Sequence, residues 1–332
     1  STGSAQLFGT GAIRMVKALS MDALSFGSET ADLDALINIA KRMDCESTQE
    51  QLRTYINEGI SYGAAFRKAL DTEILNTPNA LLGLEYIRAG LAYNAKLEYI
   101  PILRTSNHHE EMLTDELPSG TALRQLITSP GNLSSQCITS TGNLSSQLQS
   151  IIPPSIASDM TQVIENGNYV NYNRYHDMVH SLSRRTTPKK LEKFGDFNEG
   201  IEHLWSKAAQ QSSWTAATEE IKSKRYTYAR LQRMGAYLTL GITKDVLQNA
   251  MEEGPQYARL LAFNDRGRQW LRNEYEIPLI QKWVKAANEL SALGQTMHHI
   301  DTLATDIQAL CFHNERNRIG HKDYTYTPQY IK

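Results

Sequence analysis

The stretch DALSFGSETADLDALINIAKRM, residues 22–43, decides the fold class because an apolar run in it gives way to a helical pattern. The apolar run ends at Gly27 and Ser28, where a chain can turn. Beyond the turn, apolar residues recur at the spacing of one helix face, namely Leu33, Leu36, Ile37, Ala40 and Met43. Thr30 is the expected N-cap, with Asp32 in the first turn, where the helix dipole favours a carboxylate. These residues predict a strand, a turn and a helix.

The same order recurs further along the chain. TPNALLGLEYIRAGLAYNA (77–95) predicts a helix with Pro78 at its first position, where the missing N–H costs nothing. LEYIPILRT (97–105) predicts a strand, and its Pro101 indicates an edge or a bulge. PSGTALRQLI (118–127) predicts a turn that leads into another helix. Strands that alternate with helices are typical of an α/β domain with a parallel sheet.

The composition changes after this first region, which predicts a domain boundary. Residues 128–154 are rich in Ser, Thr, Asn, Gly and Gln and contain the sequence GNLSSQ twice. A six-residue repeat is too short for a solenoid unit, so a surface loop is the better interpretation. We therefore expect an α/β domain at residues 1–127, a flexible loop or linker at 128–154 and a mainly α-helical domain at 155–332.

Composition and cysteine usage exclude several classes of protein. The 332 residues are 41% hydrophobic and 21% charged with a net charge of −2, which is typical of a soluble globular protein. No apolar run is long enough for a membrane span, and no signal-peptide pattern opens the sequence. Cys45, Cys137 and Cys311 lie far apart without CxxC spacing, which argues against a disulfide framework or a structural zinc site. We expect a cytoplasmic protein, since this cysteine usage suits a reducing compartment.

Three places in the first domain put small residues where a strand meets a helix, namely Gly27-Ser28, Pro78-Asn79 and Ser119-Gly120-Thr121. Ligands of open α/β sheets bind at the carboxyl ends of the strands, and helix N-termini suit phosphate. Arg104 closes a predicted strand and Arg124 lies one turn into a predicted helix, so both could reach a bound anion. Together these features favour a nucleotide site, although each alone is also what an ordinary helix cap looks like.

A metal site is not expected. The run His108-His109-Glu110-Glu111 contains metal-binding side chains, but adjacent residues of a strand point to opposite faces. No second cluster, His298-His299 included, has the spacing of metal ligands. The sequence also contains neither a GxSxG motif nor a P-loop.

The stretch KSKRYTYARLQR, residues 222–233, gathers lysines, arginines and two tyrosines in a chain of negative net charge. If a helix begins near Thr227, Arg230 and Arg233 share one of its faces. Arginines pair with phosphates and tyrosines stack on unpaired bases. Residues 184–233 hold eleven Lys/Arg residues against six Asp/Glu residues, which makes nucleic-acid binding as good an interpretation as a merely solvated basic face.

Several blocks of the sequence, in order, resemble the bacterial tRNA(Met) cytidine acetate ligase family. The most specific block is EGIEHLWSKAAQQSSWTAATEEIKSKRYTYARLQRMGAYLTLGI (199–242), and YARLLAFNDRGRQWL (257–271) and LATDIQALCF (303–312) follow it. The front half contributes FGTGAIRMVKALSMDALSFGSE (8–29), PNALLGLEYI (78–87), LRTSNHHE (103–110) and SGTALRQLI (119–127). The resemblance covers essentially the whole chain apart from the loop at 128–154.

The resemblance implies an enzyme and a substrate. Members of this family activate acetate with ATP to acetyl-adenylate and pyrophosphate and pass the acetyl group to the wobble cytidine of elongator tRNA(Met), giving N4-acetylcytidine. The implied fold is a nucleotidyltransferase-like, Rossmann-like parallel sheet domain followed by a mainly α-helical tRNA-binding domain. ATP would be the substrate, and Mg²⁺ normally accompanies it. In-line attack on the α-phosphorus builds charge on phosphate oxygens, which guanidinium and N–H groups stabilise.

Site residues carry over from the family by position. The resemblance implies ATP contacts at Gly27, Asn79, Arg104 and Thr105, and it makes Ser119, Thr121 and Arg124 candidates for phosphate binding. It implies tRNA contacts at Lys224, Arg225, Tyr226, Arg230 and Arg233.

One departure concerns catalysis. The family begins with a strand and a turn that carries an HxGH motif, whose histidines line the triphosphate site, and these 332 residues contain no HxGH. The catalytic residues are therefore unknown. Either the first strand–helix–strand unit precedes residue 1, or the protein lacks the motif. Because an α/β domain without its first central strand exposes apolar surface, we expect the former.

Two rival functions stay open at this point. One is a nucleotidyltransferase of the same fold that acts on a small phosphorylated metabolite, which has no use for a cationic helix. The other is a tRNA-binding protein without catalysis, which is consistent with the missing HxGH motif. RNA binding separates the first rival from the ligase, and an upstream HxGH motif would eliminate the second.

Overall fold

The computed structural model describes all residues except 1–2, 105–119, 121–122, 125–147, 150–151 and 224. The chain forms two compact units. The first unit comprises Ser1–Leu103, His176–Ala304 and His321–Lys332, and the second comprises Arg104–Tyr175 and Thr305–Gly320. Within the described ranges, each helix is too short or too polar to cross a membrane.

The elements of the front part are α1 (Ala5–Ala18), β1 (Ala23–Ser28), α2 (Leu33–Met43), α3 (Glu46–Asn57), α4 (Tyr62–Leu70), α5 (Pro78–Ala92) and β2 (Glu98–Leu103). The helices that follow are α9 (Pro154–Glu165), α10 (Tyr172–Arg185), α11 (Pro188–Leu191), α12 (Ile201–Ala208), α13 (Trp214–Ile221), α14 (Tyr228–Leu240) and α15 (Lys244–Glu253). The last part holds β3 (Ala258–Arg259), β4 (Ala262–Phe263), α16 (Asp265–Trp270), β5 (Leu279–Ile280), α17 (Trp283–Ala286), α18 (Ala292–Leu310) and β6 (Gln329–Tyr330).

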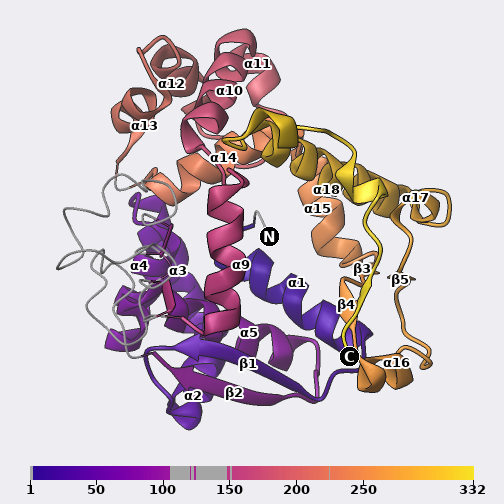
Figure 1. Ribbon diagram of the computed structural model, residues 1–332. Helices are drawn as coiled ribbons and strands as arrows, with labels where there is room; N and C mark the ends of the chain where they lie inside the picture. The colour runs from indigo at the N-terminus through magenta and orange to yellow at the C-terminus, as the bar shows by residue number, and fades with distance from the viewer. Residues whose placement is uncertain (1–2, 105–119, 121–122, 125–147, 150–151, 224) are drawn as a thin grey trace. The chain divides into compact units, whose positions relative to one another are not determined.

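The strands β1 and β2 form a parallel pair, which lies side by side in Figure 1. Parallel neighbours need a crossover connection, and α2 to α5 supply it. Pro101 lies opposite Phe26 in a continuous register without a bulge. The strand, helix and strand predicted from residues 22–105 are confirmed.

One face of this pair packs against the helices of the crossover. Phe26 joins a core cluster with buried residues of α2, α4 and α5, among them Leu36, Phe66 and Leu84. Burial of such side chains contributes about 1.5–3 kcal/mol each. The alternate residues of β2, Ile100 and Ile102, are exposed among the described residues.

Glycines allow α5 to approach the strands closely. A Cβ on Gly83 would lie 2.6 Å from a ring atom of Phe26, and a Cβ on Gly90 would overlap the hydroxyl group of Tyr99. A larger residue at either position would require the helix or the facing aromatic ring to shift. The close approach places the first turn of α5 beside the end of β1.

The cap of α2 differs from the sequence prediction. Asp32, rather than Thr30, is the N-cap, since its carboxylate accepts the backbone N–H of Ala35 at 3.0 Å. Thr30 lies two residues earlier, and its hydroxyl oxygen accepts the backbone N–H of Asp32 at 3.2 Å. The side chains of Thr30 and Asp32 thus both accept backbone N–H groups in this turn. The spacing of the sequence alone could not show which of the two caps the helix.

The helical part of the first unit is organised around aromatic side chains. Phe197 and Trp205 pack edge to face with ring centroids 4.9 Å apart, and Trp214 lies 5.0 Å from Trp205. The indole N–H of Trp205 donates to the buried hydroxyl group of Ser183 at 2.9 Å, so its polar atom is satisfied. The helix predicted to begin near Thr227 is confirmed, because Thr227 caps α14 through the backbone N–H of Arg230.

Two short parallel strand pairs, β3–β5 and β4–β6, complete the first unit. The sequence IPLIQKWVK suggests one strand, but the structure divides it between β5 and α17. Trp283 explains the division, since its buried ring packs against Tyr257 and Arg259 and its N–H donates to Thr302 at 2.9 Å. If the strand continued, the ring of Trp283 would not reach the core around Tyr257.

The second unit contains α9 and the segments around Val170 and Phe312, which form an isolated antiparallel bridge. Ala157 of α9 packs with Leu148 in a small buried cluster. Tyr169 and His313 stack with ring centroids 5.3 Å apart. The boundaries proposed at residues 127 and 154 stay a prediction.

We expect the Gly83→Ala change to lower the free energy of unfolding by roughly 1–3 kcal/mol, because the new methyl group overlaps the ring of Phe26. Gly11 is the matched control, since no atom lies within 4 Å of a Cβ built there. The Gly11→Ala change should raise the free energy by up to about 1 kcal/mol through helix propensity. Urea denaturation of both variants measures the difference, and equal effects would contradict the close packing of α5 on β1.

Candidate nucleotide and RNA sites

The carboxyl end of β1 presents the first predicted ATP residue. Gly27 lies on β1 opposite Ile102 and is exposed, whereas its neighbour Ser28 is fully buried. The hydroxyl oxygen of Ser28 accepts the backbone N–H of Thr30 at 3.2 Å, which turns the chain away from the sheet. The exposed backbone of Gly27 is therefore open to a ligand at the strand end.

Glu29 connects this strand end to the second predicted ATP residue. One oxygen of its carboxylate accepts the side-chain N–H of Asn79 at 2.7 Å, and the other accepts the backbone N–H of Ala80 at 3.0 Å. Thr77, the N-cap of α5, makes no side-chain cap, so Glu29 caps the helix from a distant part of the sequence. Gly27 and Asn79 are thereby brought to the same end of the sheet.

The charge of Glu29 is stabilised where it lies. Burial by itself raises the pKa of this carboxyl group, but hydrogen bonds from Asn79, Thr77 and backbone N–H groups outweigh burial. The pKa of Glu29 therefore lies below its ordinary value, and the group is ionised at neutral pH. An ionised carboxylate at the N-terminus of α5 also complements the helix dipole.

The arrangement fixes the amide of Asn79 in one orientation. Its side-chain nitrogen faces Glu29, so its oxygen and its second N–H have a defined direction. Such an amide offers a donor and an acceptor to a ribose hydroxyl group or to the edge of a base. Glu29 is absent from the residues predicted from the sequence, although it is the last residue of the FGSE block that carries the resemblance.

The remaining nucleotide candidates are only partly described. Arg104 follows β2 directly and is half-buried, and its Nε has no hydrogen-bond partner among the described residues. Arg124 is exposed. Its guanidinium group lies close to Gly120, since a Cβ built on Gly120 would be 3.5 Å from it, an ordinary van der Waals contact. Both arginines belong to the second unit. Outside the described residues lie Thr105, Ser119, Thr121 and the run His108-His109-Glu110-Glu111.

The predicted RNA-binding arginines converge on one acidic loop, residues 195–200. The guanidinium group of Arg233 pairs with the carboxylate of Asp196 at 2.8 Å. Arg230 donates to the side-chain oxygen of Asn198 at 3.0 Å, and Arg225 pairs with Glu199 at 2.7 Å. The shared helix face of Arg230 and Arg233 that the spacing predicts is confirmed, because Arg230 also donates to the backbone oxygen of Asp196.

The loop adopts an unfavourable backbone conformation to make these contacts. Asp196 and Glu199 have φ angles of 63° and 60°, in the left-handed region, and Gly200 has a φ of 87°. The left-handed region costs most non-glycine residues about 1–2 kcal/mol, somewhat less for Asp. Ion pairs with the arginines offset this cost, so the loop and the arginines order one another.

Tyr226 is buried beneath the arginines rather than open to solvent. Its side chain is 7% exposed, and the guanidinium groups of Arg225 and Arg230 lie 6.0 and 5.2 Å from its ring centroid. Cations stack on aromatic faces in this way. The contact with RNA predicted for Tyr226 would therefore act through the guanidinium groups that it supports. Lys224 lies outside the described residues.

The comparisons with known proteins agree with this architecture. The HIGH nucleotidyl transferase family matches residues 1–323, and the chain belongs to that family. It is similar to the tRNA(Met) cytidine acetate ligases of Alkaliphilus metalliredigens, at 29% identity over 99% of this chain and 81% of the relative, and of Acetivibrio thermocellus, at 27% identity over 97% and 80%. The resemblance read from the sequence is thus confirmed, and the names of these relatives agree with the predicted ligase class.

Solved structures confirm the fold. The apo crystal structure of Thermotoga maritima TmcAL superposes with a TM-score of 0.89 at 22% identity, covering 100% of this chain and 82% of that chain. The structure of the same protein bound with alpha-thio ATP superposes with a TM-score of 0.85, also at 22% identity, covering 99% and 81%. The predicted nucleotidyltransferase-like parallel sheet domain followed by a mainly helical part is confirmed.

We expect the Glu29→Gln change to lower the free energy of unfolding by about 1 kcal/mol at pH 7, the value of a helix cap. The folded pKa of Glu29 lies below its ordinary value of 4.5, so this stabilisation is present above that pH and is lost as the pH falls through the folded pKa. The difference between wild type and variant should shrink as the pH falls below 4.5 and vanish once the pH is below the folded pKa. Urea titrations from pH 3 to pH 8 test this, with Glu50→Gln on the exposed face of α3 as control. A pH-independent difference would contradict the role of the charge.

Two substitutions of Asp196 distinguish the contribution of its charge to stability from that of its backbone conformation. The Asp196→Asn change keeps a residue that tolerates the left-handed region but removes the ion pair with Arg233, and should cost about 1 kcal/mol. The Asp196→Ala change adds the backbone penalty and should cost about 1 kcal/mol more. Denaturation in 1 M salt should reduce the loss of unfolding free energy in Asp196→Asn, because salt screens the ion pair. The additional loss in Asp196→Ala should be unchanged. Equal losses for the two variants would contradict backbone strain in this loop.

Proposed function

We propose that this protein is an ATP-dependent ligase that acetylates the wobble cytidine of elongator tRNA(Met), with acetyl-adenylate as the intermediate. The observation that carries the proposal is the similarity along 97–99% of the chain to relatives named tRNA(Met) cytidine acetate ligase. The paired strand ends with the fixed amide of Asn79, and the arginines of α14, supply the two kinds of site that such a reaction needs.

The adenosine triphosphate would bind at the carboxyl end of β1. Gly27 offers an exposed backbone and Asn79 a directed amide, which Glu29 positions without touching the nucleotide. Arg104 and Thr105 complete the proposed ATP contacts. Ser119, Thr121 and Arg124 are the proposed phosphate contacts. Guanidinium groups in these places would stabilise the charge that develops on the phosphate oxygens.

The proposed reaction has two steps. An acetate oxygen attacks the α-phosphorus of ATP, the bond to the β-phosphate oxygen breaks, and pyrophosphate leaves with the bonding electron pair. The exocyclic amine of cytidine then attacks the acetyl carbonyl carbon, loses a proton, and AMP leaves. The products are N4-acetylcytidine, AMP and pyrophosphate.

Mg²⁺ is proposed to enter with the nucleotide. It keeps several waters and binds through phosphate oxygens in most nucleotide sites. Glu29 is the carboxylate at the strand end, but both of its oxygens already accept hydrogen bonds, so its donor set suits positioning of Asn79 better than ligation of a metal.

The tRNA would lie across the start of α14. Lys224, Arg225, Tyr226, Arg230 and Arg233 are the proposed contacts, with Tyr226 acting as the platform beneath the guanidinium groups. Both proposed substrates, ATP and tRNA, are cytoplasmic, and we propose that compartment for the protein.

The test is acetyl transfer by the full-length protein. Radiolabelled acetate, ATP and an elongator tRNA(Met) transcript should yield N4-acetylcytidine, detected by mass spectrometry of the digested RNA, together with one AMP for each acetyl group. A transcript with uridine at the wobble position should accept none. Release of pyrophosphate without acetyl transfer to RNA would contradict the proposed acceptor.

Charge removal should separate the two sites. We expect Arg104→Ala to weaken ATP binding and leave tRNA binding unchanged, and Arg230→Ala to do the reverse. The Arg230→Ala change should also lower the slope of log affinity against log salt by about 0.9 on duplex RNA, the value of one phosphate contact. Arg53, exposed on α3, is the control for loss of a positive charge. An unchanged salt slope would show that Arg230 does not contact the RNA backbone.

A further inference from the structure

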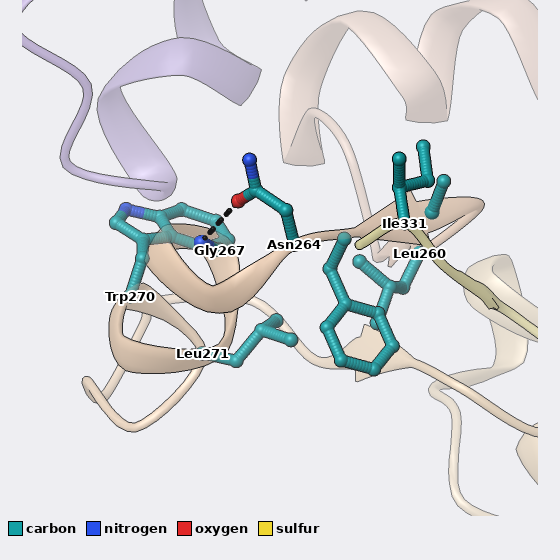
Figure 2. Close-up of a pocket in the computed structure, with 8 residues that line it drawn as sticks. Leu260, Asn264, Gly267, Trp270, Leu271 and Ile331 are labelled. Atoms are coloured by element: carbon teal, nitrogen blue, oxygen red, sulfur yellow. Dashed lines mark hydrogen bonds between the residues drawn. The ribbon is translucent and has the colours of Figure 1, made fainter.

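A pocket of about 360 Å³ opens beside α16, within the family block at residues 257–271, where the sequence predicts no individual site residue. Trp270, Leu271, Leu260, Ile331 and the cap residue Asn264 line it, with Ala262, Phe263 and Gly267 completing the walls. In Figure 2 Trp270 lies on one side of this space, Leu260 and Ile331 lie on the other, and Asn264 lies above. The volume lies at the small end of the range for ligand sites, which suits one planar group.

Local interactions hold the walls in place. The strand pair β4–β6 aligns Phe263 with Tyr330, and the two rings pack with centroids 5.6 Å apart. The hydroxyl group of Tyr330 donates to Asp265 at 2.7 Å, which fixes the end of the chain against α16. The neighbouring Ile331 is thereby kept at the pocket.

Asn264 presents a directed polar group. Its side-chain oxygen accepts the backbone N–H of Gly267 at 3.0 Å and so caps α16. Because a backbone N–H requires an acceptor, the side-chain nitrogen must face away from the helix, and Figure 2 shows this orientation. The nitrogen has no hydrogen-bond partner among the described residues, so it is available as a donor at the rim of the pocket.

Trp270 supplies an aromatic surface that the other tryptophans do not. Tyr275 packs against its ring with centroids 4.5 Å apart, and its indole borders the pocket. Trp205, Trp214 and Trp283 are 1%, 3% and 2% exposed, whereas Trp270 is partly exposed. A planar ligand can therefore reach Trp270 alone among the four.

Three exposed arginines lie near this surface, in a stretch that also holds three exposed carboxylates, Asp265, Glu274 and Glu276. Arg266, Arg268 and Arg272 are exposed on or just after α16, and no ion pair involves them in the part of the chain that the structure describes. The one carboxylate of the helix, Asp265, accepts the hydroxyl group of Tyr330. In contrast, the arginines of the 222–233 stretch that are described already bind the loop at 195–200.

We propose that this pocket binds one unstacked nucleobase of the RNA substrate, stacked on Trp270, while Arg266, Arg268 and Arg272 bind the flanking phosphates. The proposal rests on the proposed function, since it names a second contact surface for the same RNA. An aromatic ring, a directed amide and unpaired arginines are what single-stranded RNA requires. A base within a duplex cannot reach Trp270, because its faces are covered by its neighbours.

Tryptophan fluorescence of the full-length protein tests the proposal. A single-stranded RNA of mixed sequence should quench the emission, whereas a duplex of equal length should not, and the Trp270→Phe variant should lose the quenching but keep its affinity within about threefold. The Trp270→Ala change should weaken binding of the single strand about tenfold. Removal of Arg266 and Arg268 together should lower the salt slope by about 1.4 on a single strand. Tyr326→Ala, at an exposed tyrosine outside the pocket, should change neither readout.

The outcomes separate this proposal from the proposed function. Quenching that persists in Trp270→Phe, or that a duplex produces equally, would overturn the base pocket while acetyl transfer to tRNA still stands. Quenching that depends on Trp270, in a protein that transfers no acetyl group, would support the pocket and contradict the ligase. Failure to bind any RNA would overturn both.

Discussion

The carboxylate of Glu29 ties the end of β1 to the first turn of α5, and the proposed nucleotide site depends on this contact. Its two oxygens accept from Asn79 and Ala80, so one side chain both caps the helix and orients the amide beside the strand end. The contact is possible because Gly83 lets α5 approach the ring of Phe26. The close packing of α5 on β1 therefore also brings together the residues of the proposed nucleotide site.

The two proposed RNA-binding surfaces show two different uses of arginine. Around α14, ion pairs with a strained acidic loop hold the guanidinium groups in place and reduce the positive charge that they present. In the proposed complex, RNA phosphates would compete with those carboxylates, which favours backbone contacts of defined geometry over indiscriminate attraction. Around α16, exposed arginines next to Trp270 carry their charge without such partners among the described residues. Ion pairs thus fix the arginines of the first surface, whereas those of the second have no ion pair among the described residues.

Much of the fold could be predicted from local pattern. The apolar run ending at Ser28, the proline at the start of α5 and the threonine cap of α14 each reflect a preference of a few consecutive residues, and the structure confirms them. Prediction was less successful where two local signals competed. Asp32 displaced Thr30 as the cap of α2, and the strand expected around residue 280 ended early so that Trp283 could reach its core.

The sequence by itself determined the fold class, the order of the elements and the family, because periodicity, caps and motif blocks are properties of neighbouring residues. Only the tertiary structure decided which side chains meet. Glu29 and Asn79 are 50 positions apart, and Arg233 and Asp196 are 37 apart, yet each pair is within hydrogen-bond distance. Burial is decided at the same level, since Tyr226 lies under the arginines while Trp270 borders an open pocket. Contacts between distant segments depend on how helices and strands pack, and no local pattern encodes that packing.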